Sequence, residues 1–209
     1  MMITNKSGAT KDEVVATNKT GGVINLESTT ATDDKNIGIL ANEKATGINE
    51  GTIQVKTLES VGMLGQLASE VVNKKTITLL GEKGIGIFAA DKSIIQYNGG
   101  TIDVGKNGIG IYAKNFSNGD SATLPNSTIE VGENGIGVYT EAGAGENIKL
   151  ESGSIKAGKD GVGVYAVGNG GTIRATNTFN MTLGDGSSDA DKGAFGFVNV
   201  GSNNKIYSD

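Results

Sequence analysis

The sequence predicts an all-β fold, a right-handed parallel β-helix with three strands in each coil and about seven coils. Two observations lead to this fold class. A ten-residue phrase recurs four times with little change, at residues 81–90, 105–114, 132–141 and 158–167. Around each copy, short runs of alternating apolar and polar residues are separated by Gly and Asn, a pattern typical of strands joined by turns.

The spacing of the copies fits one coil of a solenoid. Seven glycines mark the centre of the phrase and of its weaker copies, namely Gly38, Gly62, Gly86, Gly110, Gly137, Gly163 and Gly196. Neighbouring members of this series lie 24, 24, 24, 27, 26 and 33 residues apart. A unit of this length buries its apolar face by stacking on the next unit. The length of the chain therefore sets the number of coils and not the number of domains.

The elements follow in order along the chain. Residues 1–20 are expected to form a polar lead-in or an incomplete coil, and residues 21–209 to form the β-helix repeats. In the coil near residue 100, strands are expected at 94–97, 101–104 and 109–113. The 101–104 strand recurs at 23–26, 52–55, 76–79, 128–131, 154–157 and 180–183, and the remaining strand at 147–150, 172–175 and 205–207.

Side chains in these strands are expected to alternate between core and surface. Ile102 and Val104 should point into the core and stack on the equivalent residues one coil away, and so should Ile85 and Ile87. Longer gaps between copies indicate loops that leave the coil, at 116–125, 141–146 and 184–193. Such loops are where rods of this kind usually carry specificity.

Composition excludes several classes of function. The chain contains no cysteine and no histidine. This excludes disulfides, a thiol nucleophile and the Ser-His-Asp and Cys-His mechanisms. A net charge of −5 and a pI near 4.9 argue against nucleic acid, which binds basic surfaces. The first residues do not resemble a secretory signal, and no apolar run is long enough for a transmembrane helix, so the chain is either cytoplasmic or a piece of a longer exported protein. The second is expected, because the repeats run to both ends without a polar capping element, which solenoids generally need.

Acidic residues suggest two candidate sites. The outward positions of the 101–104 strand and its copies form one column that includes Asp103, Glu130 and Lys156. Two carboxylates on adjacent coils could serve a glycosidase-like reaction, although a solvated polar face is the simpler interpretation. Asp185, Asp189 and Asp191 could supply oxygen ligands for calcium. A plain Asp/Gly turn explains that segment more simply, and no metal site is expected.

The third candidate is a column of apolar and aromatic residues. Phe88, Tyr112, Tyr139 and Tyr165 occupy the same position of the phrase in consecutive coils, and Leu40 and Leu64 precede them. Their parity is opposite to that of the inward residues, so they are expected on the outer surface beside outward glycines. The rings could stack on one another as a structural ladder, or they could form a strip that binds a sugar face or another chain.

The repeat resembles the passenger repeats of large type V autotransporter adhesins of the fusobacterial type. The resemblance is carried by Gly-Ile-Gly-Ile-Tyr-Ala at 108–113, Gly-Thr-Ile-Asp-Val-Gly at 100–105 and Ser-Thr-Ile-Glu-Val-Gly at 127–132. It covers about residues 21–207. It implies a β-helical passenger that is displayed on the cell surface or outer membrane, or secreted, and that meets membrane only through a C-terminal translocator barrel outside this sequence.

The resemblance implies a structural and adhesive function in virulence, with a host or bacterial cell-surface protein or glycan as partner. No catalytic residue is carried over from the family, so the chain is expected not to be an enzyme and to need no cofactor. A polysaccharide-active β-helix, either a lyase or a hydrolase, is the alternative. It would need the Asp103, Glu130 and Lys156 column as its acidic and basic groups.

Overall fold

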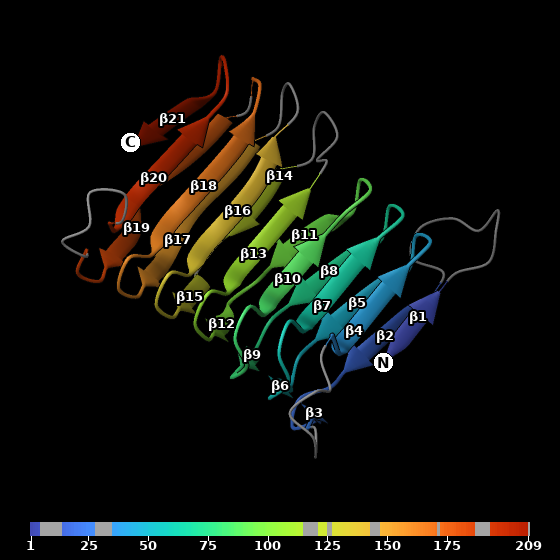
Figure 1. The fold of residues 1–209 in the computed structure, drawn as a ribbon. Helices are drawn as coiled ribbons and strands as arrows, with labels where there is room; N and C mark the ends of the chain where they lie inside the picture. Colours follow the sequence, from blue (N-terminus) through green and yellow to red (C-terminus); the bar gives the residue numbers. More distant parts are fainter. Residues whose placement is uncertain are drawn as a thin grey trace.

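The chain winds into a rod of stacked parallel strands, with the two termini at opposite ends (Figure 1). The computed structural model describes residues 1–4, 14–27, 35–114, 121–124, 127–142, 147–170, 172–186 and 193–208. Within these residues all elements are strands, and the strand pairs are parallel. The three-sided, right-handed parallel β-helix is therefore confirmed.

The first face of the rod is one sheet of eight strands. These strands are β1 (Met2–Thr4), β4 (Ile37–Asn42), β7 (Val61–Gln66), β10 (Ile85–Ala89), β13 (Ile109–Lys114), β16 (Ile136–Ala142), β18 (Val162–Gly168) and β20 (Phe195–Val200). Eight coils thus contribute to this face, where about seven were expected. The additional strand is β1, which lacks the glycine-centred phrase and was not recognisable as a copy of it.

The second and third faces form one continuous sheet of 13 strands. The second face contains β2 (Val15–Asn18), β5 (Thr46–Asn49), β8 (Glu70–Asn73), β11 (Ile94–Tyr97), β14 (Ser121–Leu124) and β21 (Lys205–Ser208). The third face contains β3 (Val23–Leu26), β6 (Thr52–Val55), β9 (Thr76–Leu79), β12 (Gly100–Val104) and β15 (Ser127–Val131). The long strands β17 (Asn147–Ala157) and β19 (Thr172–Leu183) continue around the corner and belong to both faces.

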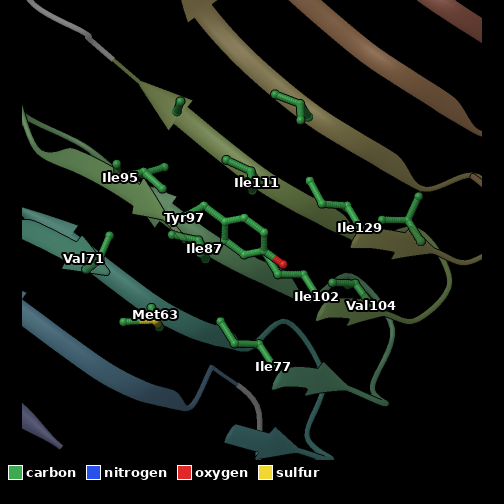
Figure 2. Packing of buried hydrophobic residues seen from close by; sticks show 14 of the residues in the cluster. Met63, Val71, Ile77, Ile87, Ile95, Tyr97, Ile102, Val104, Ile111 and Ile129 are labelled. Atoms are coloured by element: carbon green, nitrogen blue, oxygen red, sulfur yellow. The ribbon is translucent and has the colours of Figure 1, made fainter. Parts of the chain in front are cut away.

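The core consists of aliphatic columns that run along the rod. On the third face, one column is formed by residues that are completely buried, namely Ile53, Ile77, Ile102, Ile129 and Ile155. Figure 2 shows how Ile87 and Ile111 of the first face approach Ile102 and Ile129 of the third. Each fully buried aliphatic side chain contributes about 1.5–3 kcal/mol, so stacking of equivalent residues is the main source of stability.

The alternation of inward and outward side chains breaks at the repeated glycine. The expectation that both Ile85 and Ile87 point into the core is therefore wrong for Ile85. Ile87 is completely buried as expected, but Ile85 is only half-buried. A Cβ on Gly86 would lie 2.4 Å from Cγ2 of Ile102, so the glycine itself faces the core. Two consecutive inward positions fit only because one of them has no side chain, and this turns Ile85 towards the surface.

A buried amide ladder lies at the corner between the second and third faces. Asn18 donates from Nδ2 to Oδ1 of Asn49 at 2.9 Å, and Asn49 donates to Oδ1 of Asn73 at 2.8 Å. Asn73 in turn donates to the carbonyl of Lys75 at 2.8 Å. One coil further the position is occupied by Tyr97, whose ring is completely buried among aliphatic side chains (Figure 2).

The corner between the first and second faces differs along the rod. In three coils it is a short turn whose residues have positive φ, with pairs at Glu43 and Lys44, at Leu67 and Ala68, and at Asp91 and Lys92. The gap between β13 and β14 is longer, with six residues, and residues 115–120 and 143–146 lie outside the described part. In the described residues there is no helix that could cross a membrane.

Candidate functional site

The aromatic column lies on the outer surface of the first face. Phe88 is in register with Tyr112, Tyr112 with Tyr139, and Tyr139 with Tyr165. Leu64 and Leu40 continue the same column towards the N-terminus. All six side chains are half-buried. The column predicted from the repeat is therefore present, with its members one strand spacing apart.

The rings of the column stack on one another. The centroids of Phe88 and Tyr112 are 4.6 Å apart with an interplanar angle of 16°, and those of Tyr139 and Tyr165 are 5.5 Å apart at 9°. Tyr112 and Tyr139 meet edge to face, with 4.7 Å between centroids and an angle of 75°. In the Phe88–Tyr112 pair, stacking covers one face of each ring with the other ring. Contacts of this kind contribute about 0.5–1.5 kcal/mol beyond area burial.

A carboxylate contacts the column through a tyrosine hydroxyl group. The Tyr112 hydroxyl donates a short hydrogen bond to Oε1 of Glu141, which follows Tyr139 by two residues. Burial, this hydrogen bond to the acceptor carboxylate and the charge of Glu141 raise the pKa of Tyr112. Burial and the same carboxylate also raise the pKa of Tyr139. Tyr112 and Tyr139 therefore stay neutral over the ordinary pH range.

The neighbours of the rings are aliphatic and not glycine, contrary to expectation. The residue three positions before each ring is half-buried on the same surface, in the series Ile37, Val61, Ile85, Ile109, Ile136 and Val162. The glycines between the two columns face the core, as at Gly110, where a Cβ would lie 2.3 Å from Cγ2 of Ile129. The first face therefore displays two parallel apolar columns.

The acidic candidate lies on the third face. Asp103 is in register with Glu130, and Glu130 with Lys156. Lys156 Nζ lies 3.9 Å from Glu130 Oε2, and both side chains are well exposed. Partial desolvation and the neighbouring Glu130 raise the pKa of Asp103, while Lys156 opposes this change. The three groups form an open polar strip, and solvent reduces the strength of their interactions.

The calcium candidate falls mainly on residues that the structure does not describe. Asp185 is exposed in the segment after β19, whereas Asp189 and Asp191 lie outside the described residues. Among the residues that are described, no group of three acidic side chains could hold a metal ion.

Sequence reasoning missed two interactions. The amide ladder of Asn18, Asn49 and Asn73 could have been found, because each Asn stands shortly before a third-face strand. The bond between Tyr112 and Glu141 joins residues 29 positions apart in neighbouring coils. A gap of that size is set by the length of one corner loop, so the repeat pattern gave no signal for it.

The fold and the columns can now be compared with known proteins. The family model of the BigA third pectate lyase-like domain matches residues 1–119. The chain belongs to this family. The matched part of the BigA-family chain includes Phe88 and Tyr112, while Tyr139 and Tyr165 follow it. Searches among curated proteins and among solved structures find no match.

Proposed function

We propose that the chain is a structural and adhesive segment of a surface-displayed passenger protein, related to the fusobacterial type of autotransporter adhesin, and that it is not an enzyme. Membership of the BigA third-domain family supports a place in a large bacterial surface protein. The partner would be a protein or glycan on a host or bacterial cell, and the parent protein would be held at the outer membrane or secreted.

The observation that carries this proposal is the repetition of one outer surface in register along the rod. Equivalent side chains recur at each coil of the eight-stranded first face, about 4.8 Å apart. A surface that repeats in this way suits spacing or multivalent attachment, where several weak contacts act together. A single catalytic centre needs the opposite, one place at which unlike groups converge.

The aromatic column is the part of this surface that we assign to attachment. A glycan usually packs its apolar face against the face of a ring, but Phe88 and Tyr112 use those faces on each other. Edges and phenol hydroxyl groups remain for contact, together with the aliphatic column beside them. Hydroxyl groups in a row offer hydrogen bonds to a protein or to sugar hydroxyls along the rod.

An attachment assay tests the proposal. The triple variant Tyr112→Ser, Tyr139→Ser and Tyr165→Ser is compared with a control triple on the third face, Gln54→Ser, Thr78→Ser and Thr182→Ser. We expect the purified wild-type chain to coat cells or beads and promote attachment, and the ring triple to lose this activity per folded molecule. Loss of melting temperature with unchanged attachment would restrict the rings to a structural role.

A polysaccharide-active enzyme is the second candidate. It is favoured by the adjacency of Asp103 and Glu130 and by the raised pKa of Asp103, because a carboxyl that keeps its proton can act as an acid. Incubation with a panel of polysaccharides distinguishes the two functions. New reducing ends or unsaturated sugars that disappear in Glu130→Gln would replace the adhesive proposal with an enzymatic one.

A further inference from the structure

Three of the five tyrosines lie in direct contact on consecutive coils. Tyr112 and Tyr139 are in register on neighbouring strands with centroids 4.7 Å apart, and Tyr139 and Tyr165 with centroids 5.5 Å apart. The three rings are half-buried, so each keeps part of its edge on the surface. Among the described residues, the other two tyrosines, Tyr97 and Tyr207, do not stack on another aromatic ring.

We propose that this column is an oxidative cross-linking site, at which Tyr139 forms a dityrosine bond with Tyr112 or Tyr165 and joins neighbouring coils covalently. The chain has no cysteine, so no disulfide can perform this role. The co-reactant is a one-electron oxidant, such as a peroxidase supplied with hydrogen peroxide.

The bond forms by coupling of two tyrosyl radicals. Each of two tyrosines loses one electron and its phenolic proton and becomes a tyrosyl radical. The radicals join through the ring carbons ortho to their oxygens, and those two carbons pass their hydrogens, as protons, back to the oxygens, which restores the aromatic rings. The net change is the loss of two protons and two electrons, which convert one hydrogen peroxide into two waters.

The environment of the column favours this reaction over competing sites. The Tyr112 hydroxyl already donates to the Glu141 carboxylate, which can accept the proton as the electron leaves. Contact between the rings lets two radicals meet without a large movement of the backbone. Tyr97 is completely buried in the core, where an oxidant cannot reach it. Tyr207 is exposed and lies under the guanidinium of Arg174, whose carbon is 5.4 Å from the ring centroid.

The position of the column gives the bond a structural consequence. It would join β13 to β16, or β16 to β18, on the first face of the rod. A covalent link between neighbouring coils restricts the unfolded chain and raises stability, as a disulfide does. Oxidation would therefore strengthen the C-terminal half of the rod, which contains the three tyrosine rings.

The test oxidises the full chain at low concentration with a peroxidase and hydrogen peroxide and isolates the monomer by gel filtration. Dityrosine fluorescence and mass spectrometry of proteolytic fragments then locate the bond, which removes the mass of two hydrogen atoms. The matched variants are Tyr139→Phe and Tyr207→Phe. Phenylalanine keeps the ring and its packing but cannot form the radical, and melting curves verify that both variants are folded.

We expect the wild-type monomer and the Tyr207→Phe monomer to acquire dityrosine and a higher melting temperature. The Tyr139→Phe monomer should stay at background, because Tyr112 and Tyr165 are separated by two strand spacings. Two results would overturn the proposal. One is dityrosine in the Tyr139→Phe monomer at the wild-type level, and the other is dityrosine that occurs only in covalent dimers.

Discussion

The N-terminal and C-terminal coils of this rod place their stacked ladders on different sides of the backbone. At the corner between the second and third faces, the N-terminal coils contain Asn18, Asn49 and Asn73, whereas the equivalent positions of later coils contain Leu150 and Ala175. The interior column thus changes from hydrogen-bonded amides to apolar side chains. Polar groups inside the rod are tolerated because each amide is hydrogen-bonded, Asn18 and Asn49 to the next coil and Asn73 to the Lys75 carbonyl.

The outer column of the first face changes from aliphatic to aromatic side chains along the rod. It begins with Leu40 and Leu64 and continues with Phe88, Tyr112 and three further coils of ring or aliphatic residues. Both changes occur in the same coil, which contains Phe88 outside and Tyr97 inside. Tyr97 ends the amide ladder, since the single hydrogen of its hydroxyl has two backbone carbonyls within reach, Gly100 at 2.9 Å and Thr128 at 3.3 Å.

The difference teaches that a repeat can keep its register while it changes the interaction that enforces it. Paired amides fix the register of N-terminal coils at a buried corner. On the surface of the C-terminal coils, stacked rings make contacts in the same register. Both devices act between equivalent residues of adjacent coils, where a solenoid gains much of its stability.

The largest expected effect comes from the glycine of the phrase. In Gly110→Ala, the new Cβ would lie 2.3 Å from Cγ2 of Ile129 and 2.6 Å from the carbonyl oxygen of Gly137. We expect a loss of about 3 kcal/mol in the free energy of unfolding, or failure to fold. The control is Gly196→Ala in the last coil, where only Sδ of Met181 lies near, at 3.5 Å. Chemical denaturation should find little change there, and equal effects would refute the close approach between coils.

A smaller effect is expected from the amide ladder. Asn49→Ala removes the acceptor of Asn18 and the donor to Asn73, which leaves buried polar atoms without these partners. We expect a cost of about 2–3 kcal/mol and faster hydrogen exchange in β5 and β8. The matched control is Asn25→Ala, an exposed residue of the third face, which should change stability by less than about 0.5 kcal/mol. Similar costs for both variants would contradict a role for the ladder.

The ring column can be tested by pH. The pKa values of Tyr112 and Tyr139 are raised in the folded chain, so the folded state holds the phenolic protons more tightly than the unfolded state. Their contribution to stability is complete below the unfolded pKa of about 10 and is lost as the pH rises further. We expect Tyr112→Phe to reduce the alkaline loss of melting temperature, with the remainder due to Tyr139 and the buried Tyr97. A parallel pH profile in the variant would refute this assignment.

The smallest effect concerns Asp103. Its pKa is raised in the folded chain, so its favourable contribution exists below the unfolded pKa and is lost as the pH rises through the folded value. Near neutral pH the ionised carboxyl faces Glu130 and destabilises the third face. Asp103→Asn should therefore gain a few tenths of a kcal/mol at neutral pH, since exposed charges are screened, and nothing near pH 3. A gain of the same size at both pH values would point to a cause other than charge.

Much of the fold could be predicted because the same pattern of apolar, polar and turn residues recurs in several coils. The third-face strands were placed correctly, as Ile102 and Val104 are buried and Asp103 is exposed. Because equivalent residues stack in consecutive coils, the same pattern recurs in each copy of the repeat. The period, the parallel register and the aromatic column therefore follow from the sequence alone.

The remaining errors come from places where a local rule of alternation fails. Ile85 was assigned to the core because period two counts Gly86 as a surface position, but a residue without a side chain can face inwards beside Ile87. The Tyr112 to Glu141 bond depends on the length of a corner loop, which no strand pattern encodes. The attachment role of the rings remains a prediction.

The direction of the backbone hydrogen bonds sets how the rod responds to force. These bonds link residues about one coil apart, such as the Ile94 amide to the Ser69 carbonyl, and therefore run along the rod. A pull on the two termini, which lie at opposite ends, opens such bonds one coil at a time from an end (Figure 1). Each released coil of 24 residues, as between Asn49 and Asn73, extends to roughly 80 Å from a rise of about 4.8 Å. The rod is thus a stack of extensible segments that can lengthen under force.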